Sequence, residues 1–482
     1  MSERHVVILG GGITGLTVAF RLLESSKKLG ILLRCTICEQ DNRLGGKIRT
    51  HQSDEYTVEF GPDSIFTRKR GGVELIRALD LESEKVPIRS GSSAYVLHKS
   101  RLRQLPPGMS YGVPSDLGAM AQTPLLSPLG KIRALADLFL PSAASGVDLS
   151  VGDFLRRRLG DELVDVIAAP LLAGIHAGDI DRLSLDATMP LLRSMSEQHR
   201  SLILGAMAQS QARSKNGSKQ DPPQPMFVTL RDGLESLIDR LADRLKGFAE
   251  VRLNTRATGV RHRVDRGYEV TVQSQLQSAD QAEVLTADAV VVTIPAFAAA
   301  TVLTSLNVDS GLLSSIRYVS TATVTLGYAG NVLPPEMTAS GFVVPPGEKR
   351  VLTACTFVSN KWPHAVRNGH TLIRCYLGRD GDESSVHWSD EQMEEAVRGD
   401  LRQILGINAA PETVLISRWM DAMPQYDVGH LNRIKEIDRQ VAGYPGLVLA
   451  GAAYRGVGIP DCVVDATRAA ENVLAYLTSE NR

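Results

Sequence analysis

Residues 5–15, His5-Val6-Val7-Ile8-Leu9-Gly10-Gly11-Gly12-Ile13-Thr14-Gly15, decide the fold of the N-terminal region. The continuous apolar run before Gly10 predicts a short strand that is buried on both faces. The glycines interrupt that strand, and a helical pattern follows them. Apolar residues then recur on one helix face, at Leu16, Ala19, Phe20 and Leu23.

The spacing Gly10-x-Gly12-x-x-Gly15 is typical of a dinucleotide-binding turn. In such a turn the first glycine permits the sharp bend, the second admits a pyrophosphate close to the backbone, and the third lets helix and strand pack closely. The pyrophosphate is expected at the helix N-terminus, where free N–H groups and the helix dipole favour negative charge. The loop residues predicted to bind the dinucleotide are Gly10, Gly11, Gly12, Ile13, Thr14 and Gly15.

A second apolar run, residues 31–38, ends at Glu39, which lies 24 residues after Gly15 (39 − 15). A carboxylate about 20 residues after the turn accepts the ribose hydroxyls in dinucleotide folds. The alternative is an ordinary strand–helix–strand unit whose second strand happens to end in Glu. The combined spacing favours the dinucleotide interpretation, and Gln40 is expected to lie beside it.

Composition sets outer limits on the function. The chain has 482 residues, which predicts two or three domains, and its net charge of −1 gives no sign of a nucleic-acid partner. No apolar run approaches the ~20 residues that span a bilayer. The first strand begins near the N-terminus and leaves no room for a secretory signal, so a cytoplasmic location is expected.

The five cysteines are odd in number and scattered, which is no disulfide framework. Cys35 and Cys38 have the spacing of redox or zinc pairs, but within a strand they face opposite sides. We interpret them as small buried hydrophobes, because no second pair matches them. No zinc signature or serine–histidine–acid arrangement occurs in the sequence, so no metal ligand and no catalytic side chain is predicted.

Two further turns suggest ligand contacts. Residues 43–47, RLGGK, place two glycines beside cations directly after Glu39, which suits a second approach of backbone to phosphate. Residues 61–64, GPDS, follow a short strand, and three cations follow at 68–70. A charge run is usually a solvated face, although an anionic substrate would also suit it.

These motifs together resemble the flavin-containing amine oxidase superfamily, and within it the bacterial protoporphyrinogen/coproporphyrinogen oxidase family of haem biosynthesis. Later blocks carry the resemblance along nearly the whole chain: PLLAGIHAGDI (170–180), RSLILG (200–205), KWPH (361–364), MPQYDVGH (423–430) and GVGIPDC (456–462).

The resemblance implies an α/β fold with a discontinuous Rossmann-like FAD-binding domain, a mixed-sheet substrate domain and an inserted helical subdomain. The expected divisions are 1–75, 226–300 and 432–482 for FAD, 76–105 and 301–431 for the substrate, and 106–208 for the helical insert. Residues 209–225 lack aromatic and large aliphatic side chains and predict a flexible linker. Residues 125–140 are apolar, which suits packing within the insert, a ligand channel or weak peripheral contact with a membrane surface.

The resemblance also implies site residues. The helix that begins near Asp461 would point its N-terminus at the flavin ring, where a positive dipole end stabilises negative charge. Expected cofactor contacts beyond the first turn are Glu39, Gln40, Arg43, Gly45, Gly46, Lys47, Gly61, Pro62, Asp63, Ser64, Val260, Ala450, Gly451, Gly458 and Ile459. Expected substrate contacts are Lys69, Ile175 and Tyr376.

The implied reaction is oxidation of coproporphyrinogen III, a tetrapyrrole, by non-covalent FAD and molecular oxygen, with release of peroxide. Three two-electron rounds would remove six electrons, and the carboxylates of the substrate would suit the cations at 68–70. Ala453 precedes Tyr454, where covalent amine oxidases carry a cysteine, which favours non-covalent FAD. Protoporphyrinogen IX is the alternative substrate, followed by an amine; a non-catalytic flavin-binding subunit is the alternative of another class. The sequence leaves the oligomeric state open.

Overall fold

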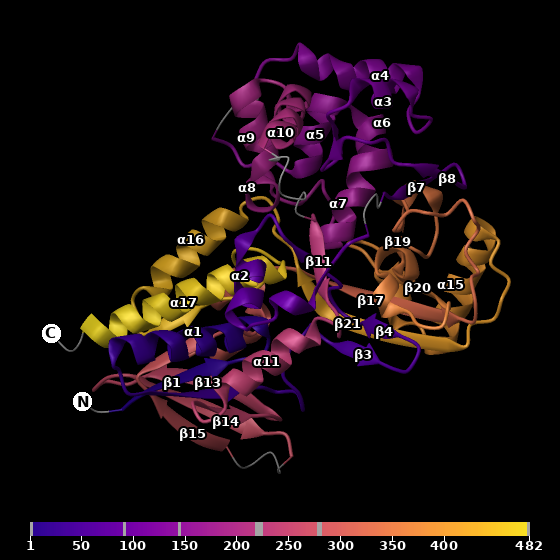
Figure 1. Cartoon of the computed structure of the whole chain (residues 1–482). Helices are drawn as coiled ribbons and strands as arrows, with labels where there is room; N and C mark the ends of the chain where they lie inside the picture. Colours follow the sequence, from indigo (N-terminus) through magenta and orange to yellow (C-terminus); the bar gives the residue numbers. More distant parts are fainter. Residues whose placement is uncertain (1–2, 90–92, 143–145, 217–224, 277–281, 480–482) are drawn as a thin grey trace.

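The computed structural model describes residues 3–89, 93–142, 146–216, 225–276 and 282–479. It has three parts, seen in Figure 1 as a lower α/β layer, a large sheet beside it and a helical part above both. Among the helices of these residues, none combines the length and apolar character that crossing a membrane requires.

The α/β layer contains a five-stranded parallel sheet built from distant segments of the chain. Its central strand pairs with one strand that follows directly and with another more than 280 residues away, in the registers Val6↔Cys35 and Val6↔Ala289. In spatial order the strands are β12 (Ala249–Arg252), β2 (Leu33–Cys38), β1 (Arg4–Leu9), β16 (Ala289–Val292) and β22 (Leu447–Leu449). The sheet is therefore discontinuous in sequence.

Each face of this sheet packs against its own hydrophobic core, as the near-continuous apolar strands require. One face carries the helices α1 (Ile13–Leu29), α2 (Arg70–Ala78), α11 (Glu235–Leu245) and α17 (Ile459–Ser479). The other face carries the strands β13 (Thr255–His262), β14 (Tyr268–Ser274) and β15 (Ala282–Ala287), with the helices α12 (Ala296–Val302), α13 (Ser310–Ser314) and α16 (His430–Val441). Cys35 belongs to the first core and Cys38 to the second, so their side chains do face opposite sides and no disulfide joins them.

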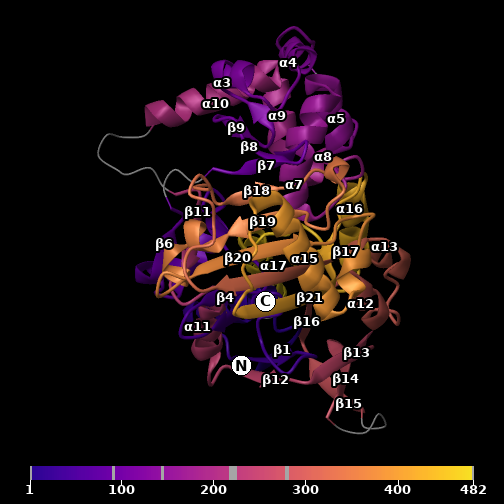
Figure 2. The ribbon, with the colours of Figure 1, turned by 90° about the vertical axis from the view of Figure 1, so that its right-hand side faces the viewer.

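The large sheet has seven strands and is mixed, because β18 pairs with β7 in parallel and the other neighbours are antiparallel. Helix α15 (Asp390–Leu405) packs on one face of it. The strands in order are β21 (Thr413–Pro424), β17 (Tyr318–Tyr328), β20 (Thr371–Leu377), β19 (Ala354–Phe357), β18 (Gly341–Val343), β7 (Tyr95–His98) and β8 (Arg101–Gln104). Figure 2 shows these strands lying between the helical part and the parallel sheet.

A small sheet and a hairpin lie near the boundary of the two large sheets. The small sheet pairs β5 (Ile65–Phe66) with β11 (Phe227–Leu230) and β11 with β6 (Lys85–Pro87). The hairpin pairs β3 (Thr50–Gln52) with β4 (Thr57–Glu59). In sequence, β3, β4, β5 and β6 precede the helical part and β11 follows it.

The helical part has its own apolar core. Its helices are α3 (Leu117–Gln122), α4 (Pro128–Leu135), α5 (Val151–Leu159), α6 (Asp161–Leu163), α7 (Ala169–His176), α8 (Leu185–Thr188), α9 (Pro190–His199) and α10 (Leu202–Asn216). A π-helical turn, Val164–Ala168, precedes α7, and a short hairpin, β9 (Met109–Ser110) with β10 (Val113–Pro114), precedes α3.

The linker prediction for 209–225 is wrong over its first half. Residues 209–216 complete α10, whereas 217–224 lie outside the described residues. Gln, Ala, Arg and Lys are good helix formers, so a polar composition alone does not end a helix that has already begun. Of the apolar stretch 125–140, Leu125 and Leu126 are buried, whereas Leu129, Ile132 and Phe139 are exposed.

Candidate active site

One cavity of about 2930 Å³ runs between the parallel sheet, the mixed sheet and the lower end of the helical part. Ordinary ligand pockets measure roughly 300–1,000 Å³, so this cavity has room for more than one ligand. Eighteen of the predicted site residues line it: Gly10, Gly12, Ile13, Thr14, Glu39, Gln40, Gly45, Gly46, Lys47, Gly61, Pro62, Asp63, Ser64, Lys69, Ile175, Tyr376, Gly458 and Ile459.

The first glycine turn has the shape that a dinucleotide requires. Gly10 has φ +103°, in the region that favours glycine, and a side chain at Gly15 would overlap the carbonyl oxygen of Gly10. Gly12 differs, because a Cβ there would meet no atom within 4 Å. Gly12 is also the N-cap of α1 and offers no capping side chain. The first N–H groups of α1 therefore open onto free space, which is where an anion would bind.

Glu39 fixes this turn from the end of β2. One oxygen, Oε2, accepts a hydrogen bond from Gly11 N at 2.6 Å, and the other, Oε1, accepts one from Asp41 N at 2.9 Å. Burial raises the pKa of Glu39, and the backbone N–H groups of Asp41 and Gly11 oppose that shift. Each carboxylate oxygen can accept a further bond, so Glu39 could still take ribose hydroxyls.

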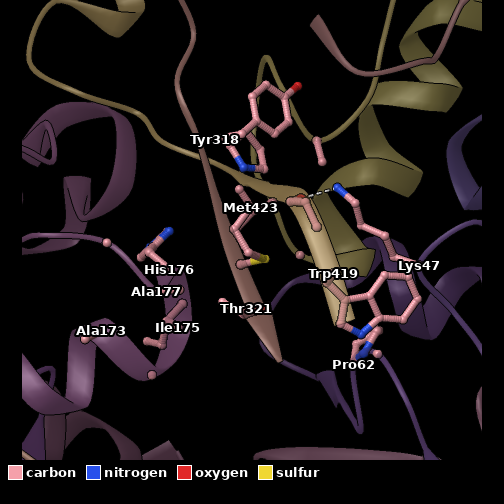
Figure 3. Close-up of a pocket in the computed structure, with 18 of the residues that line it drawn as sticks. Lys47, Pro62, Ala173, Ile175, His176, Ala177, Tyr318, Thr321, Trp419 and Met423 are labelled. Atoms are coloured by element: carbon pink, nitrogen blue, oxygen red, sulfur yellow. Dashed lines mark hydrogen bonds between the residues drawn. The ribbon is translucent and has the colours of Figure 1, made fainter. Parts of the chain in front are cut away.

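The second glycine turn runs beside the first, with Gly45 N donating to Gly11 O at 2.9 Å. Gly45 and Gly46 both have positive φ, +103° and +55°. The two cations of this turn donate to backbone carbonyls, and of the two only Lys47 lines the cavity. Arg43 donates to the carbonyls of Leu44, Gly46 and Ile48, and Lys47 Nζ donates to Ala422 O (Figure 3).

The GPDS turn is held by residues far away in sequence. Asp63 Oδ2 pairs with Lys361 Nζ at 2.6 Å, and Arg374 donates to the carbonyls of Phe60 and Gly61. Burial alone would raise the pKa of Asp63, but the charges of Lys361 and Arg374 outweigh it and hold the pKa at about 2. A side chain at Gly61 would overlap the backbone carbonyl of Lys47, so the two turns pack tightly against each other.

Helix α17 presents its N-terminus to the cavity. Residues 452, 453 and 455–462 line the wall there, and Gly456 has φ +136°. Asp461 accepts hydrogen bonds from Gly458 N at 3.3 Å and Lys69 Nζ at 2.7 Å. The positive end of a long helix thus faces the space between the glycine turns and the mixed sheet.

The other end of the cavity is more apolar. Ala173, Ile175, His176 and Ala177 of α7 and its C-terminal turn face Thr321 and Met423 of the mixed sheet (Figure 3). Ile175 is 47% exposed although it is a large aliphatic residue. Burial lowers the pKa of His176 to about 4, and the charge of Lys69 adds to this, so the imidazole is neutral near pH 7. Tyr376 lies in β20 with the Arg374 guanidinium 5.0 Å from its ring centre.

The structure brings six predicted residues close to this site but not to the cavity surface: Gly11, Gly15, Arg43, Val260, Ala450 and Gly451. Gly11, Gly15 and Arg43 shape the turns described above. Gly451 N donates to Asp465 Oδ2 at 2.8 Å and supports α17 from behind.

Val260 does not line the cavity, and the expected contact of its backbone with the cofactor stays a prediction. Its side chain is fully buried in the core, and its carbonyl oxygen accepts a hydrogen bond from Ser305 Oγ. Arg256, Ala257 and Thr258 of the same strand line the cavity instead. A bulge between Ala257 and Gly259 shifts the pairing, and an apolar β-branched residue beyond it is drawn into the core.

Sequence reasoning missed Thr293, which fixes the first glycine turn, and it missed Lys361 and Arg374, which hold the turn at residues 61–64. Thr293 Oγ1 donates to Leu9 O at 2.7 Å and Gly10 O at 3.1 Å, which fixes the first turn. A polar residue directly after the apolar strand 289–292 was the available signal. The pairing of Lys361 with Asp63 has no local signal, because 298 residues separate them.

Comparisons with known proteins agree with this geometry. The family model described as flavin containing amine oxidoreductase matches residues 13–474. The chain is 40% identical over 478 residues to the coproporphyrinogen III oxidase of Bacillus subtilis, covering 99% of each chain. It is 34% identical to the Staphylococcus aureus enzyme of the same name, covering 98% of this chain and 100% of that one. A crystal structure named for a protoporphyrinogen oxidase of Exiguobacterium has a TM-score of 0.85 and 37% identity, with 98% of this chain and 99% of that chain covered.

Proposed function

This chain belongs to the flavin-containing amine oxidoreductase family, and from that premise we propose that it oxidises coproporphyrinogen III to coproporphyrin III with FAD and oxygen. Membership makes it an oxidoreductase with a flavin cofactor. The choice of a porphyrinogen is supported by relatives that match over the full length and carry that name. The release of hydrogen peroxide and the place in haem biosynthesis belong to the same proposal.

The single observation that carries the proposal is the continuous cavity. It joins a dinucleotide-shaped turn at one end to an apolar chamber with cationic residues in its wall at the other. A volume of about 2930 Å³ suits a dinucleotide together with a substrate as large as a tetrapyrrole.

The residues present fit FAD. The open space at Gly12 and the free N–H groups of α1 suit its pyrophosphate, and Glu39 suits a ribose. The N-terminus of α17 suits the carbonyl edge of the flavin ring. When bound, FAD supplies the two-electron acceptor that amino-acid side chains lack.

Non-covalent attachment is part of the proposal. Ala453 lines the cavity at the position where a thioether link would need a cysteine. Cys462 also lines the cavity, but burial raises the pKa of its thiol to about 11, with hydrogen bonding from Thr14 and the charge of Lys47 opposing the shift. A thiol that stays protonated is a weak nucleophile.

In this mechanism the chain positions the substrate and controls the polarity around it. Ile175, Thr321 and Met423 line the chamber, and a substrate seated against them would displace water from it, which strengthens electrostatic effects there. The dipole of α17 stabilises negative charge that develops at its N-terminus. His176 is neutral and its carbonyl is held by Gln425 Nε2 at 3.0 Å, so it shapes the wall without supplying a positive charge.

The division of the chain remains a proposal as well: 1–75, 226–300 and 432–482 for FAD, 76–105 and 301–431 for the substrate, and 106–208 as the helical insert. The insert begins just after β8, at the edge of the mixed sheet, and residue 208 lies within α10. We propose that α7, at its base, forms the substrate wall. This assignment rests on the cavity-lining residues of α7.

Porphyrin fluorescence during aerobic incubation tests the proposal. Coproporphyrinogen III and protoporphyrinogen IX are supplied separately, with peroxide measured in parallel. Faster formation of coproporphyrin, with three peroxides per porphyrin, supports the proposal. Faster formation of protoporphyrin would transfer the assignment to the second candidate, which the name of the Exiguobacterium relative favours. No porphyrin from either substrate, with FAD bound, would refute both.

A further inference from the structure

Arg379 stands at a fixed turn beside the apolar chamber. It follows β20 across Gly378, whose φ is +83°, and a Cβ at Gly378 would lie only 2.7 Å from Ser320 O and Val386 Cγ2. The turn is closed by two backbone hydrogen bonds, from Arg379 N to Asp382 O at 3.2 Å and from Asp382 N to Arg379 O at 2.9 Å. Arg379 therefore has little freedom to move its backbone away from the cavity that it lines.

The Arg379 side chain lacks a counter-charge within the described part of the chain. Its Nε is buried and has no hydrogen-bond partner there, and no carboxylate comes within ion-pair distance. The adjacent Asp380 is occupied, because Arg317 binds it through two hydrogen bonds of 2.9 and 2.8 Å. Asp382 is exposed, and its charge only partly offsets the burial that lowers the pKa of Arg379.

The other enclosed cations of the cavity all have protein partners: Lys47 and Arg374 donate to backbone carbonyls. Arg156, Arg350 and Lys361 each pair with a carboxylate. Lys69, which the sequence suggested for this role, is paired with Asp461 at 2.7 Å. A half-buried guanidinium without a partner is costly, and an anion placed against it would recover that cost.

The neighbours of Arg379 place it at the substrate end. Asp380 N donates to Ala177 O at 2.8 Å, which joins this turn to the end of α7. Ile175 lies on that same segment, and Tyr376 lies three residues before Arg379 on β20. All three residues line the cavity, so Arg379 belongs to the chamber rather than to the glycine turns.

We propose that Arg379 binds a carboxylate of the tetrapyrrole and thereby fixes the orientation of the macrocycle against α7. This inference rests on the proposed function. The planar guanidinium presents two parallel N–H donors, which match the two oxygens of a carboxylate and select its orientation. In this proposal Lys69 serves mainly to hold Asp461 at the start of α17, a different role from the substrate contact expected from the charge run at 68–70.

Equilibrium binding of coproporphyrin III to the FAD-loaded protein tests the inference, with porphyrin fluorescence as the readout. Removing a charge-assisted pair from an enclosed site should raise the dissociation constant about 10- to 100-fold in Arg379→Gln. Arg379→Lys keeps the positive charge but loses the two parallel N–H donors of the guanidinium. Its affinity for coproporphyrin III should therefore lie between those of Arg379→Gln and the wild type. Arg439→Gln is the matched control, because Arg439 is 71% exposed on α16 and makes the same change in net charge.

Flavin content and the thermal midpoint are measured for each variant, so that a folding defect is recognised. An unchanged dissociation constant in Arg379→Gln overturns the inference, as does an equal loss in Arg379→Gln and Arg439→Gln. Failure of the proposed function has a different signature, since the wild-type protein would then bind no porphyrin. If the wild type binds coproporphyrin III and Arg379→Gln binds it weakly, the result supports both the role of Arg379 and the proposed function.

Discussion

The substitution Gly12→Ala separates the stability of the first turn from its capacity to bind FAD. Gly12 has φ −74° and ψ −179°, an extended conformation that alanine adopts without strain. A Cβ at this position meets no protein atom within 4 Å. The added methyl group therefore enters the space in which the pyrophosphate is expected.

Gly12→Ala should change the stability of the apoprotein much less than it changes the affinity for FAD. Without flavin, alanine lowers the conformational entropy of the unfolded chain, which stabilises the folded protein by about 0.4–1 kcal/mol. Alanine is also a poorer N-cap than glycine, which destabilises the folded protein by about 0.5–1 kcal/mol. These terms nearly cancel, so the free energy of unfolding of the apoprotein should stay within about 1 kcal/mol of the wild type. Intrusion of a methyl group into an occupied site costs about 1–3 kcal/mol, which corresponds to a 5- to 150-fold weaker FAD affinity.

The assay is quenching of flavin fluorescence on titration of apoprotein, with urea unfolding in parallel. Gly399→Ala is the matched control, because Gly399 lies on α15 outside the cavity and a Cβ there also meets nothing within 4 Å. Gly15→Ala should instead disrupt folding, since its side chain would overlap Gly10 O and lie 2.9 Å from Thr293 Oγ1. If Gly12→Ala binds FAD as tightly as the wild type, the pyrophosphate does not cross this turn.

Three further predictions concern buried charge and the cofactor. In the helical part Arg158 and Asp137 form a buried pair at 2.5 Å, so Arg158→Ala should lower the free energy of unfolding by about 3–5 kcal/mol in urea; a loss below 1 kcal/mol would contradict this. Burial lowers the pKa of His430 to about 4, so only the unfolded state takes up its proton between pH 6.5 and 4. The stability advantage of the wild type over His430→Gln should therefore shrink by about 2 kcal/mol between pH 7 and pH 5, and an advantage independent of pH would refute this. Acid precipitation should leave the flavin in the supernatant, whereas flavin retained by the precipitate would show a covalent link.

The parts of the fold that the sequence predicts are those governed by local geometry. Gly10 and Gly15 are needed because of contacts within one turn, and the run ending at Leu9 has to be buried on both faces. The same local logic places Glu39 at the end of its strand. The discontinuous parallel sheet also follows, because later apolar runs need partners that the N-terminal segment supplies, whereas the mixed sheet was expected from the family resemblance.

What the sequence did not predict comes mainly from interactions between distant residues. Val260 lies away from the cavity surface because a bulge, set by pairing with β14, shifts the strand. The pairing of Lys69 with Asp461 has no local signal, because 392 residues separate them. Residues 209–216 were taken as a linker because polar helices on a surface carry no periodic signal.

The most direct test of the central claim is an anaerobic titration of the flavin-loaded protein with coproporphyrinogen III. Absorbance near 450 nm reports oxidised flavin, and fluorescence reports porphyrin. The account predicts that flavin absorbance is lost as porphyrin appears, with three flavins reduced for each porphyrin formed, and that oxygen restores the absorbance. Flavin that stays oxidised in the presence of coproporphyrinogen III, but is reduced by an amine, would contradict the account.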